Sequence, residues 1–130
     1  SLRAIARELS ESRAQEVSPR EVLELAQAGD AAAQRLIGDA GRWLGLAVAN
    51  LCNLLNPECV IVGGELSAAG EVLLGPLRET VRRNGIPSAV SALEITSGTL
   101  GERAEMLGAL ALVLREAERF EAPALAREAA

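Results

Sequence analysis

The 130-residue chain contains no histidine, no lysine and no tyrosine. Without histidine it cannot form a Ser–His nucleophile, and without lysine it cannot form a Walker-type phosphate loop. Its only aspartates are Asp30, which suits a helix N-cap, and Asp39, which suits a solvated position within a helix. A general base for group transfer is therefore missing, and we do not expect this chain alone to be an enzyme.

Cysteines and aromatic residues are scarce. Cys52 and Cys59 are the only cysteines, they form no close pair, and no histidine accompanies them, so a zinc site made by this chain alone is not expected. Both are predicted to be buried free thiols, which fits the reducing cytoplasm. With one tryptophan (Trp43) and one phenylalanine (Phe120), the core must be aliphatic. Trp43 is predicted to fill a core or an interface.

Positive charge is also limited, because the formal net charge is −5 and the arginines are scattered. Arg82-Arg83 is the one adjacent basic pair, and it suits the C-terminal end of a helix. Binding to nucleic acid needs clustered positive charge, so this chain is not expected to bind DNA. No signal peptide is recognisable, and the apolar stretch 44–55 is too short to span a membrane.

The first half of the chain has the spacing of three helices. Apolar residues predict a short helix near 2–9, and Ser18-Pro19-Arg20-Glu21 has the form of a capping box that opens a second helix, ending at Gly29. Asp30 can cap a long third helix that runs to about Asn56. This helix carries Gly41, Gly45 and Ala49 four residues apart, a ridge of small residues that allows close packing.

The segment 56–67 is the most informative part of the sequence. Asn56-Pro57 ends the long helix, and the apolar run Cys59–Val62 predicts a short strand covered on both faces. Gly63-Gly64 follows this strand, at the end where ligands bind in open α/β sheets. Glycines let the backbone approach a ligand closely. The alternative is a tight connection that binds no ligand.

The second half of the chain continues the alternation of helices and strands. It predicts a helix over 72–84 that Gly75-Pro76 kinks or restarts, a connection over 86–92 and a half-exposed strand over 93–96. A final helix over 101–120 is predicted to bury one face, formed by Met106, Leu107, Leu110, Ala111 and Leu114. The order is α-α-α-β-α-β-α in one domain over 1–120, with 121–130 as a flexible tail.

Two segments together resemble one protein family. The first is Gly41-Arg42-Trp43-Leu44-Gly45 through Asn56-Pro57, continuing into Val60-Ile61-Val62-Gly63-Gly64-Glu65-Leu66-Ser67; the second is 100–112, Leu-Gly-Glu-Arg-Ala-Glu-Met-Leu-Gly-Ala-Leu-Ala-Leu. Both are similar to the C-terminal lobe of the ROK family, whose name groups repressors, open reading frames and sugar kinases. The resemblance covers most of the chain, to about Leu114.

The resemblance implies an α/β fold, the C-terminal part of the actin-like ATPase (ribonuclease H-like) fold of sugar kinases. Family kinases phosphorylate hexoses with ATP, and family repressors bind sugars as effectors and add a DNA-binding helix-turn-helix. By resemblance, the cofactor-binding residues are Gly63, Gly64, Glu65 and Leu66. Glu65 departs from the pattern, because kinases often have a third glycine there, and its carboxylate adds bulk and negative charge beside a polyphosphate site.

Other parts that the family implies are expected before Ser1: the phosphate loop, the catalytic aspartate and a zinc motif. We therefore expect no cofactor in this chain, and zinc with or without ATP in a full-length parent. The expected partners are an N-terminal lobe, a sugar effector and a second copy of the chain, with DNA bound only through a helix-turn-helix outside this chain. The leading hypothesis is the C-terminal part of the sugar-effector domain of a cytoplasmic ROK-type repressor, which supplies one side of the nucleotide cleft and dimer contacts. The alternatives are the C-terminal lobe of a glucokinase-like ROK sugar kinase and a purely structural module.

Overall fold

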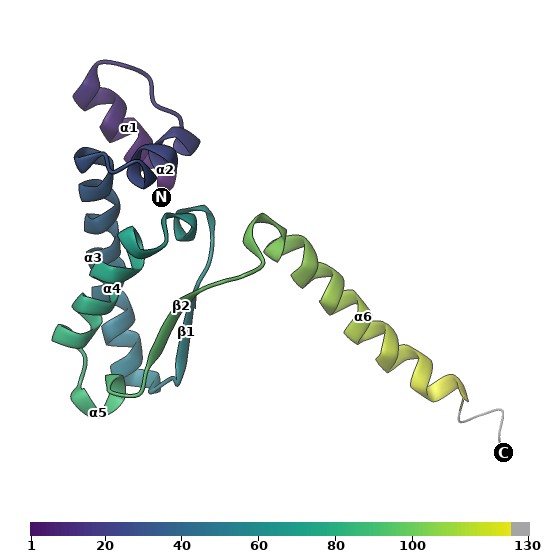
Figure 1. Cartoon of the computed structure of the whole chain (residues 1–130). Helices are drawn as coiled ribbons and strands as arrows, with labels where there is room; N and C mark the ends of the chain where they lie inside the picture. The colour runs from purple at the N-terminus through teal and green to yellow at the C-terminus, as the bar shows by residue number, and fades with distance from the viewer. Residues whose placement is uncertain (126–130) are drawn as a thin grey trace. The chain divides into compact units, whose positions relative to one another are not determined.

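The computed structural model describes the backbone of residues 1–125 and the side chains of 1–101 and 103–117. The chain divides into two units, Ser1–Thr99 and a second that starts at Leu100, and each is described by itself. Figure 1 labels the helices and strands of both.

Three helices open the first unit: α1 (Leu2–Arg13), α2 (Pro19–Gln27) and α3 (Ala31–Leu55). The predicted capping box is present at the start of α2, where Glu21 N–H donates to Ser18 Oγ (3.2 Å) and Ser18 N–H donates to Glu21 Oε2 (2.7 Å). Asp30 caps α3 by accepting from the Ala33 N–H at 2.9 Å. The predicted apolar face of the first helix is buried, and it consists of Leu2, Ile5, Ala6 and Leu9.

The close contact between α3 and α4 (Glu71–Asn84) organises the unit. Gly41 and Gly45 of α3 lie directly against α4: a Cβ on Gly41 would collide with the Leu73 carbonyl oxygen, and one on Gly45 would lie 2.8 Å from the Leu77 carbonyl oxygen. The predicted ridge of small residues is confirmed as the surface that brings the two helices together.

A two-stranded parallel sheet completes the unit. β1 (Cys59–Val62) pairs with β2 (Glu94–Ser97) so that Val60 is opposite Ile95. Between them run the 3-10 helix η1 (Glu65–Ala69), α4 and the short α5 (Pro87–Val90). One face of the sheet packs on α3 and α4 in a cluster of three buried residues and their neighbours: Leu77, Val81 and Ile95, with Val48, Val60, Val62, Val90 and Leu93.

Two predictions about burial in this unit are wrong, and one of the two alternatives in a third is excluded. β1 is covered on one face only, because the side chains of Cys59 and Ile61 point away from the helices and are exposed. The prediction that both thiols are buried is wrong for Cys59, which is exposed, and right for Cys52, which is buried. Trp43 is 74% exposed, which excludes the core alternative for this residue, while the interface alternative stays a prediction.

Two element predictions also need correction. α4 continues through Gly75-Pro76 as one helix, so the predicted restart is wrong and the kink stays a prediction. Pro76 lies in the second turn, where the packing on α3 tolerates a single lost backbone hydrogen bond. The connection 86–92 contains the helix α5, which starts at Pro87, a residue whose fixed φ suits a first helical position.

The second unit begins with the 3-10 helix η2 (Gly101–Arg103) and continues as α6 (Ala104–Leu125). The face predicted to be buried is exposed within this unit: Met106 is 64%, Leu110 53% and Leu114 58% exposed. The predicted helix is confirmed, but the described residues of this unit do not cover its apolar face. Residues 126–130 of the predicted tail lie outside the described residues, and 121–125 belong to α6.

The observed order therefore agrees with the predicted α/β arrangement, with η1, α5 and η2 added. Among the described residues, no helix has the length and apolarity that crossing a membrane requires. Within the same residues, no three potential metal ligands of the His, Cys, Asp and Glu types gather in one place.

Replacing Gly41 with leucine should destabilise the first unit by about 1–3 kcal/mol or more, because the side chain would force α3 away from the backbone of α4. The matched control is Gly38→Ala in α3, where an added Cβ would lie 3.6 Å from its nearest neighbour, the Pro76 Cγ, and removing a helical glycine should stabilise by up to about 1 kcal/mol. Chemical denaturation measures both changes. Equal stabilities for Gly41→Leu and the unmodified chain would show that the ridge is incidental.

The N-cap of α3 should make stability depend on pH. The Ala33 N–H, and then the Arg13 side chain, hold the pKa of Asp30 below its ordinary value of 3.8. Its stabilising effect is therefore complete above pH 3.8 and is lost as the pH falls through the lower folded value. Asp30→Asn keeps a capping oxygen but removes the titration, so unfolding measured between pH 6 and pH 2 should vary less steeply. Parallel curves for the two proteins would contradict this.

Candidate functional site

The turn that follows β1 is the best-defined candidate site. Gly63 and Gly64 are both exposed, and a Cβ on either would meet nothing within 4 Å. Gly64 has φ +85° and ψ 172°, a conformation that is essentially restricted to glycine. Ser67 fixes the turn, because its N–H and its hydroxyl both donate to the Gly64 carbonyl oxygen, at 3.1 and 2.7 Å. The result is an open stretch of backbone held in a defined shape.

The end of β2 lies beside this turn. The strands are parallel, and the Gly98 N–H donates to the Val62 carbonyl oxygen at 3.0 Å, so both strands end at the same edge of the sheet. This is the edge at which ligands bind in open α/β sheets. Sequence reasoning treated Ser97-Gly98 only as a strand breaker. The available signal was Gly98, which comes directly after the second strand, at the position equivalent to Gly63.

The four residues predicted to bind a cofactor do not all point the same way. Gly63, Gly64 and Glu65 are exposed at the turn, and Glu65 begins η1. Leu66 is half-buried and packs against the core formed with the N-terminal helices. The turn therefore offers a ligand two glycine backbones and one carboxylate, while Leu66 anchors the turn to the fold.

Arg78 of α4 links this helix to the strand β2, a role that sequence reasoning missed. Its Nε–H donates to the Ile95 carbonyl oxygen at 2.9 Å, and its Nη1 lies 2.8 and 2.9 Å from the two carboxylate oxygens of Glu71. Because Glu71 begins α4, this pair joins the start of the helix to the middle of β2. No sequence motif marks such a contact, since it depends on how α4 lies over the sheet.

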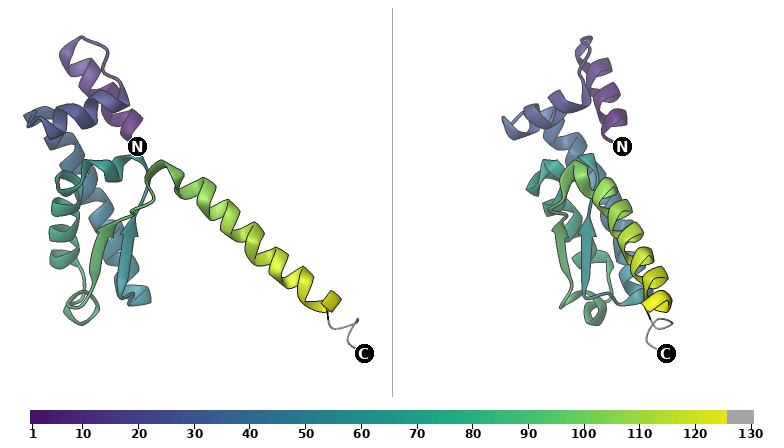
Figure 2. Two further views of the ribbon diagram at one scale, coloured as in Figure 1. Left: turned by 45° about the vertical axis from the view of Figure 1, so that its right-hand side comes forward. Right: turned by 90° about the vertical axis from the view of Figure 1, so that its right-hand side faces the viewer.

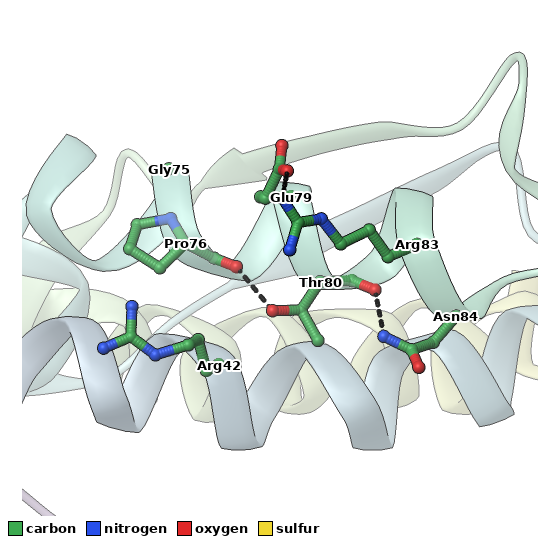
Figure 3. A pocket seen from close by; sticks show the side chains of 7 residues that line it. All are labelled: Arg42, Gly75, Pro76, Glu79, Thr80, Arg83 and Asn84. Carbon is green, nitrogen blue, oxygen red and sulfur yellow. Dashed lines mark hydrogen bonds and ion pairs between the residues drawn. The ribbon is translucent and has the colours of Figure 1, made fainter.

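A separate surface hollow of about 520 Å³ lies along the groove between α3 and α4 (Figure 3). Seven residues line it: Arg42, Gly75, Pro76, Glu79, Thr80, Arg83 and Asn84. Its charged groups already have partners, since Arg42 pairs with Asp39, and Glu79 pairs with both Arg82 and Arg83. The Arg82 hydrogen bond and the charge of Arg83 lower the pKa of Glu79. The close helix contact explains this hollow without a ligand.

Comparison with known sequences identifies the family. The ROK family pattern matches residues 1–116. The chain belongs to the ROK family. A glucokinase from Halalkalibacterium halodurans is 33% identical over 105 residues, covering 81% of this chain and 32% of that protein. A xylose repressor from Caldicellulosiruptor bescii is 32% identical over 105 residues, covering 81% of this chain and 26% of that protein.

Solved structures agree with this assignment. A ROK family glucokinase from Streptomyces griseus, in complex with glucose and AMPPNP, aligns with a TM-score of 0.69 and 29% identity over 85% of this chain and 36% of that one. A ROK family transcriptional regulator, a homolog of the E. coli MLC protein, aligns with a TM-score of 0.67 and 28% identity over 75% of this chain and 27% of that one. The fold is the C-terminal part of the actin-like ATPase fold. The chain spans about a third or less of the length of the Halalkalibacterium glucokinase and the Caldicellulosiruptor repressor.

The two glycines of the ROK turn should respond differently to alanine. Gly64→Ala should cost about 1–3 kcal/mol, because alanine must adopt the strained backbone conformation that Gly64 has. Gly63→Ala should change stability by less than about 0.5 kcal/mol, because it has neither a positive φ nor a neighbour for the new methyl group. Thermal and chemical unfolding measure both. A Gly64→Ala protein as stable as Gly63→Ala would show that the turn can relax.

Proposed function

We propose that this ROK chain is part of the sugar-effector domain of a transcriptional repressor, where it forms one side of the nucleotide-type cleft and supplies contacts to a second copy. The observation that carries the proposal is Glu65, exposed directly after the Gly63-Gly64 turn. The turn has the open backbone of a nucleotide site, but the residue that follows it is negatively charged.

The charge of Glu65 is the argument against a polyphosphate at this turn. Two like charges about 4 Å apart repel by about 1 kcal/mol in water and by several kcal/mol where solvent is partly excluded. The chain as a whole is also acidic, with a formal net charge of −5, so its wider field does not offset the local repulsion. A lobe that no longer has to hold ATP could keep this turn for its structure, while the parent responds to a sugar.

The proposal extends to partners outside this chain. The sugar effector would bind with the help of an N-terminal lobe, and DNA would be bound by a separate helix-turn-helix. Zinc, and ATP if any is bound, would belong to the full-length parent, and the protein would act in the cytoplasm. The residues proposed to border the cleft are Gly63, Gly64, Glu65 and Leu66.

The second candidate is a glucokinase-like lobe of a ROK sugar kinase. The similarity to the Halalkalibacterium halodurans glucokinase and to the Streptomyces griseus glucokinase structure favours it. In that case the open backbone at Gly63 and Gly64 would approach the adenosine, and Glu65 would have to turn away from the phosphates. The repressor and kinase proposals therefore disagree about how Glu65 affects nucleotide binding.

The test uses both the chain and its full-length parent. A coupled assay should detect no ADP release that depends on ATP and hexose, from either one. Titration with AMPPNP should show weak or no binding by the parent and at least tenfold tighter binding by Glu65→Gly, because the substitution removes the charge. The control is Glu58→Gln, an equally exposed glutamate at the opposite end of β1, which should leave binding unchanged.

Operator binding completes the test. The parent should bind DNA containing its own promoter region and release it when a sugar is added, as an electrophoretic shift would show. Hexose-dependent ADP release by the parent, together with no DNA binding, would overturn the repressor proposal and establish the kinase.

A further inference from the structure

The edge of β2 that faces away from β1 receives a hydrogen bond from a side chain. The Gly98 N–H donates to the Val62 carbonyl oxygen on the β1 side at 3.0 Å. Because backbone groups alternate in direction along a strand, the Ile95 C=O points to the opposite edge. There it accepts the Arg78 Nε–H at 2.9 Å. In both views of Figure 2, β2 lies on the side of β1 towards α4, the helix that carries this arginine.

The same guanidinium group also holds the segment that leaves the Gly63-Gly64 turn. Its Nη1 lies 2.8 and 2.9 Å from the two carboxylate oxygens of Glu71, the first residue of α4. The chain reaches Glu71 from the turn through η1 and Gly70, whose φ is +57°. One side chain therefore bonds to the two segments that border the turn, which are the η1–α4 junction and β2.

The backbone that carries Arg78 is itself firmly fixed. Leu77, the preceding residue, is fully buried, and its carbonyl oxygen lies directly against Gly45 of α3. Close-packed interiors leave little room for a helix to shift. The guanidinium group therefore extends from a rigid part of α4, and its two bonds can determine where the less tightly packed ends of the sheet and of η1 lie.

We infer that Arg78 is a positioning residue for the Gly63-Gly64 turn. By bonding to Ile95 and to Glu71 at once, it keeps the end of β2 and the segment that leaves the turn at a set separation. A ligand at the turn would then meet the glycine backbone and Gly98 in one defined arrangement, without contact to Arg78 itself. Functional sites need such supporting residues around the groups that meet the ligand. The inference rests on the turn bordering the cleft of the proposed function and adds the residue that sets its geometry.

The chemistry of arginine suits this role better than that of lysine. A guanidinium group is a rigid planar fork that donates in several fixed directions, whereas an ammonium group is a compact charge on a flexible stem. The two bonds of Arg78 also differ in weight. Glu71 is 76% exposed, so water screens its ion pair, and exposed pairs contribute little. The bond to the Ile95 carbonyl oxygen is partly buried and charge-assisted, so we expect it to dominate.

Amide hydrogen exchange, resolved by residue with NMR, tests the inference. Arg78→Ala should speed exchange at the Gly98 and Ser67 amides by about tenfold or more, because it releases both segments beside the turn. Amides in α1 and α2, such as those of Leu9 and Ala26, should keep their rates within about threefold. The matched control is Arg82→Ala, which removes an arginine of α4 that pairs with Glu79 on the same helix and should change none of these rates.

Two further variants separate the two bonds. Glu71→Ala changes an exposed side chain and leaves the bond to Ile95 in place, so it should speed exchange at Ser67 and leave Gly98 unchanged. Arg78→Lys keeps the positive charge but offers a single ammonium group, so it should protect one of the two amides and not both. A role in overall stability alone would not produce either pattern, because it would change all amides together.

The outcomes are separate from those that decide the proposed function. Unchanged exchange at Gly98 and Ser67 in Arg78→Ala would overturn the inference, and so would equal acceleration at Leu9 and Ala26. Full protection of both amides in Arg78→Lys would show that the directed fork is not required and would overturn it as well. None of these measurements uses a nucleotide, a sugar or DNA, so the inference can fail while the repressor proposal stands, and the reverse.

Discussion

The contact between α3 and α4 is the constraint on which the rest of the first unit depends. Gly41 and Gly45 bring the backbones of the two helices so close that no side chain fits between them. α4 connects β1 to β2, so its position determines that of the sheet. Arg78 completes the connection by donating to the Ile95 carbonyl oxygen while it pairs with Glu71. The position of the Gly63-Gly64 turn therefore depends on the packing of α3 against α4, which is not part of the turn itself.

At the Gly63-Gly64 turn, the backbone shape favours a nucleotide ligand, whereas the charge of Glu65 disfavours one. The open backbone at Gly63 and Gly64 is what a nucleotide site requires, and the ROK relatives include glucokinases and repressors alike. Glu65, exposed directly after the turn, adds a negative charge that, in the proposed function, would oppose a polyphosphate. Family membership does not determine the ligand of the turn, because one exposed side chain is enough to change the electrostatics of a site.

The uncovered surfaces of the two units have a common origin. The side of α3 with Leu51, Leu54 and Leu55, the outer face of β1 and the apolar face of α6 all carry residues of a type that normally packs inside proteins, yet they are exposed within their own units. Soluble monomers rarely leave large contiguous apolar surfaces open. The chain aligns with only about a third of the length of its solved relatives, so these surfaces are where other segments or other copies are to be sought.

The local structure followed from the sequence because short-range rules determine it. Ser18, Pro19 and Glu21 specified a capping box, Asp30 the start of α3, and Asn56-Pro57 its end. The ridge of Gly41 and Gly45 was also visible, since glycines inside a helix need a packing reason. Burial could not be predicted in the same way, because an apolar sequence such as Cys59–Val62 is compatible with a strand covered on one face or on both. Only the tertiary structure decided that Cys59, Ile61 and Trp43 are exposed, that Gly98 lies beside Val62 and that Arg78 bonds to β2, because each depends on segments distant in the chain.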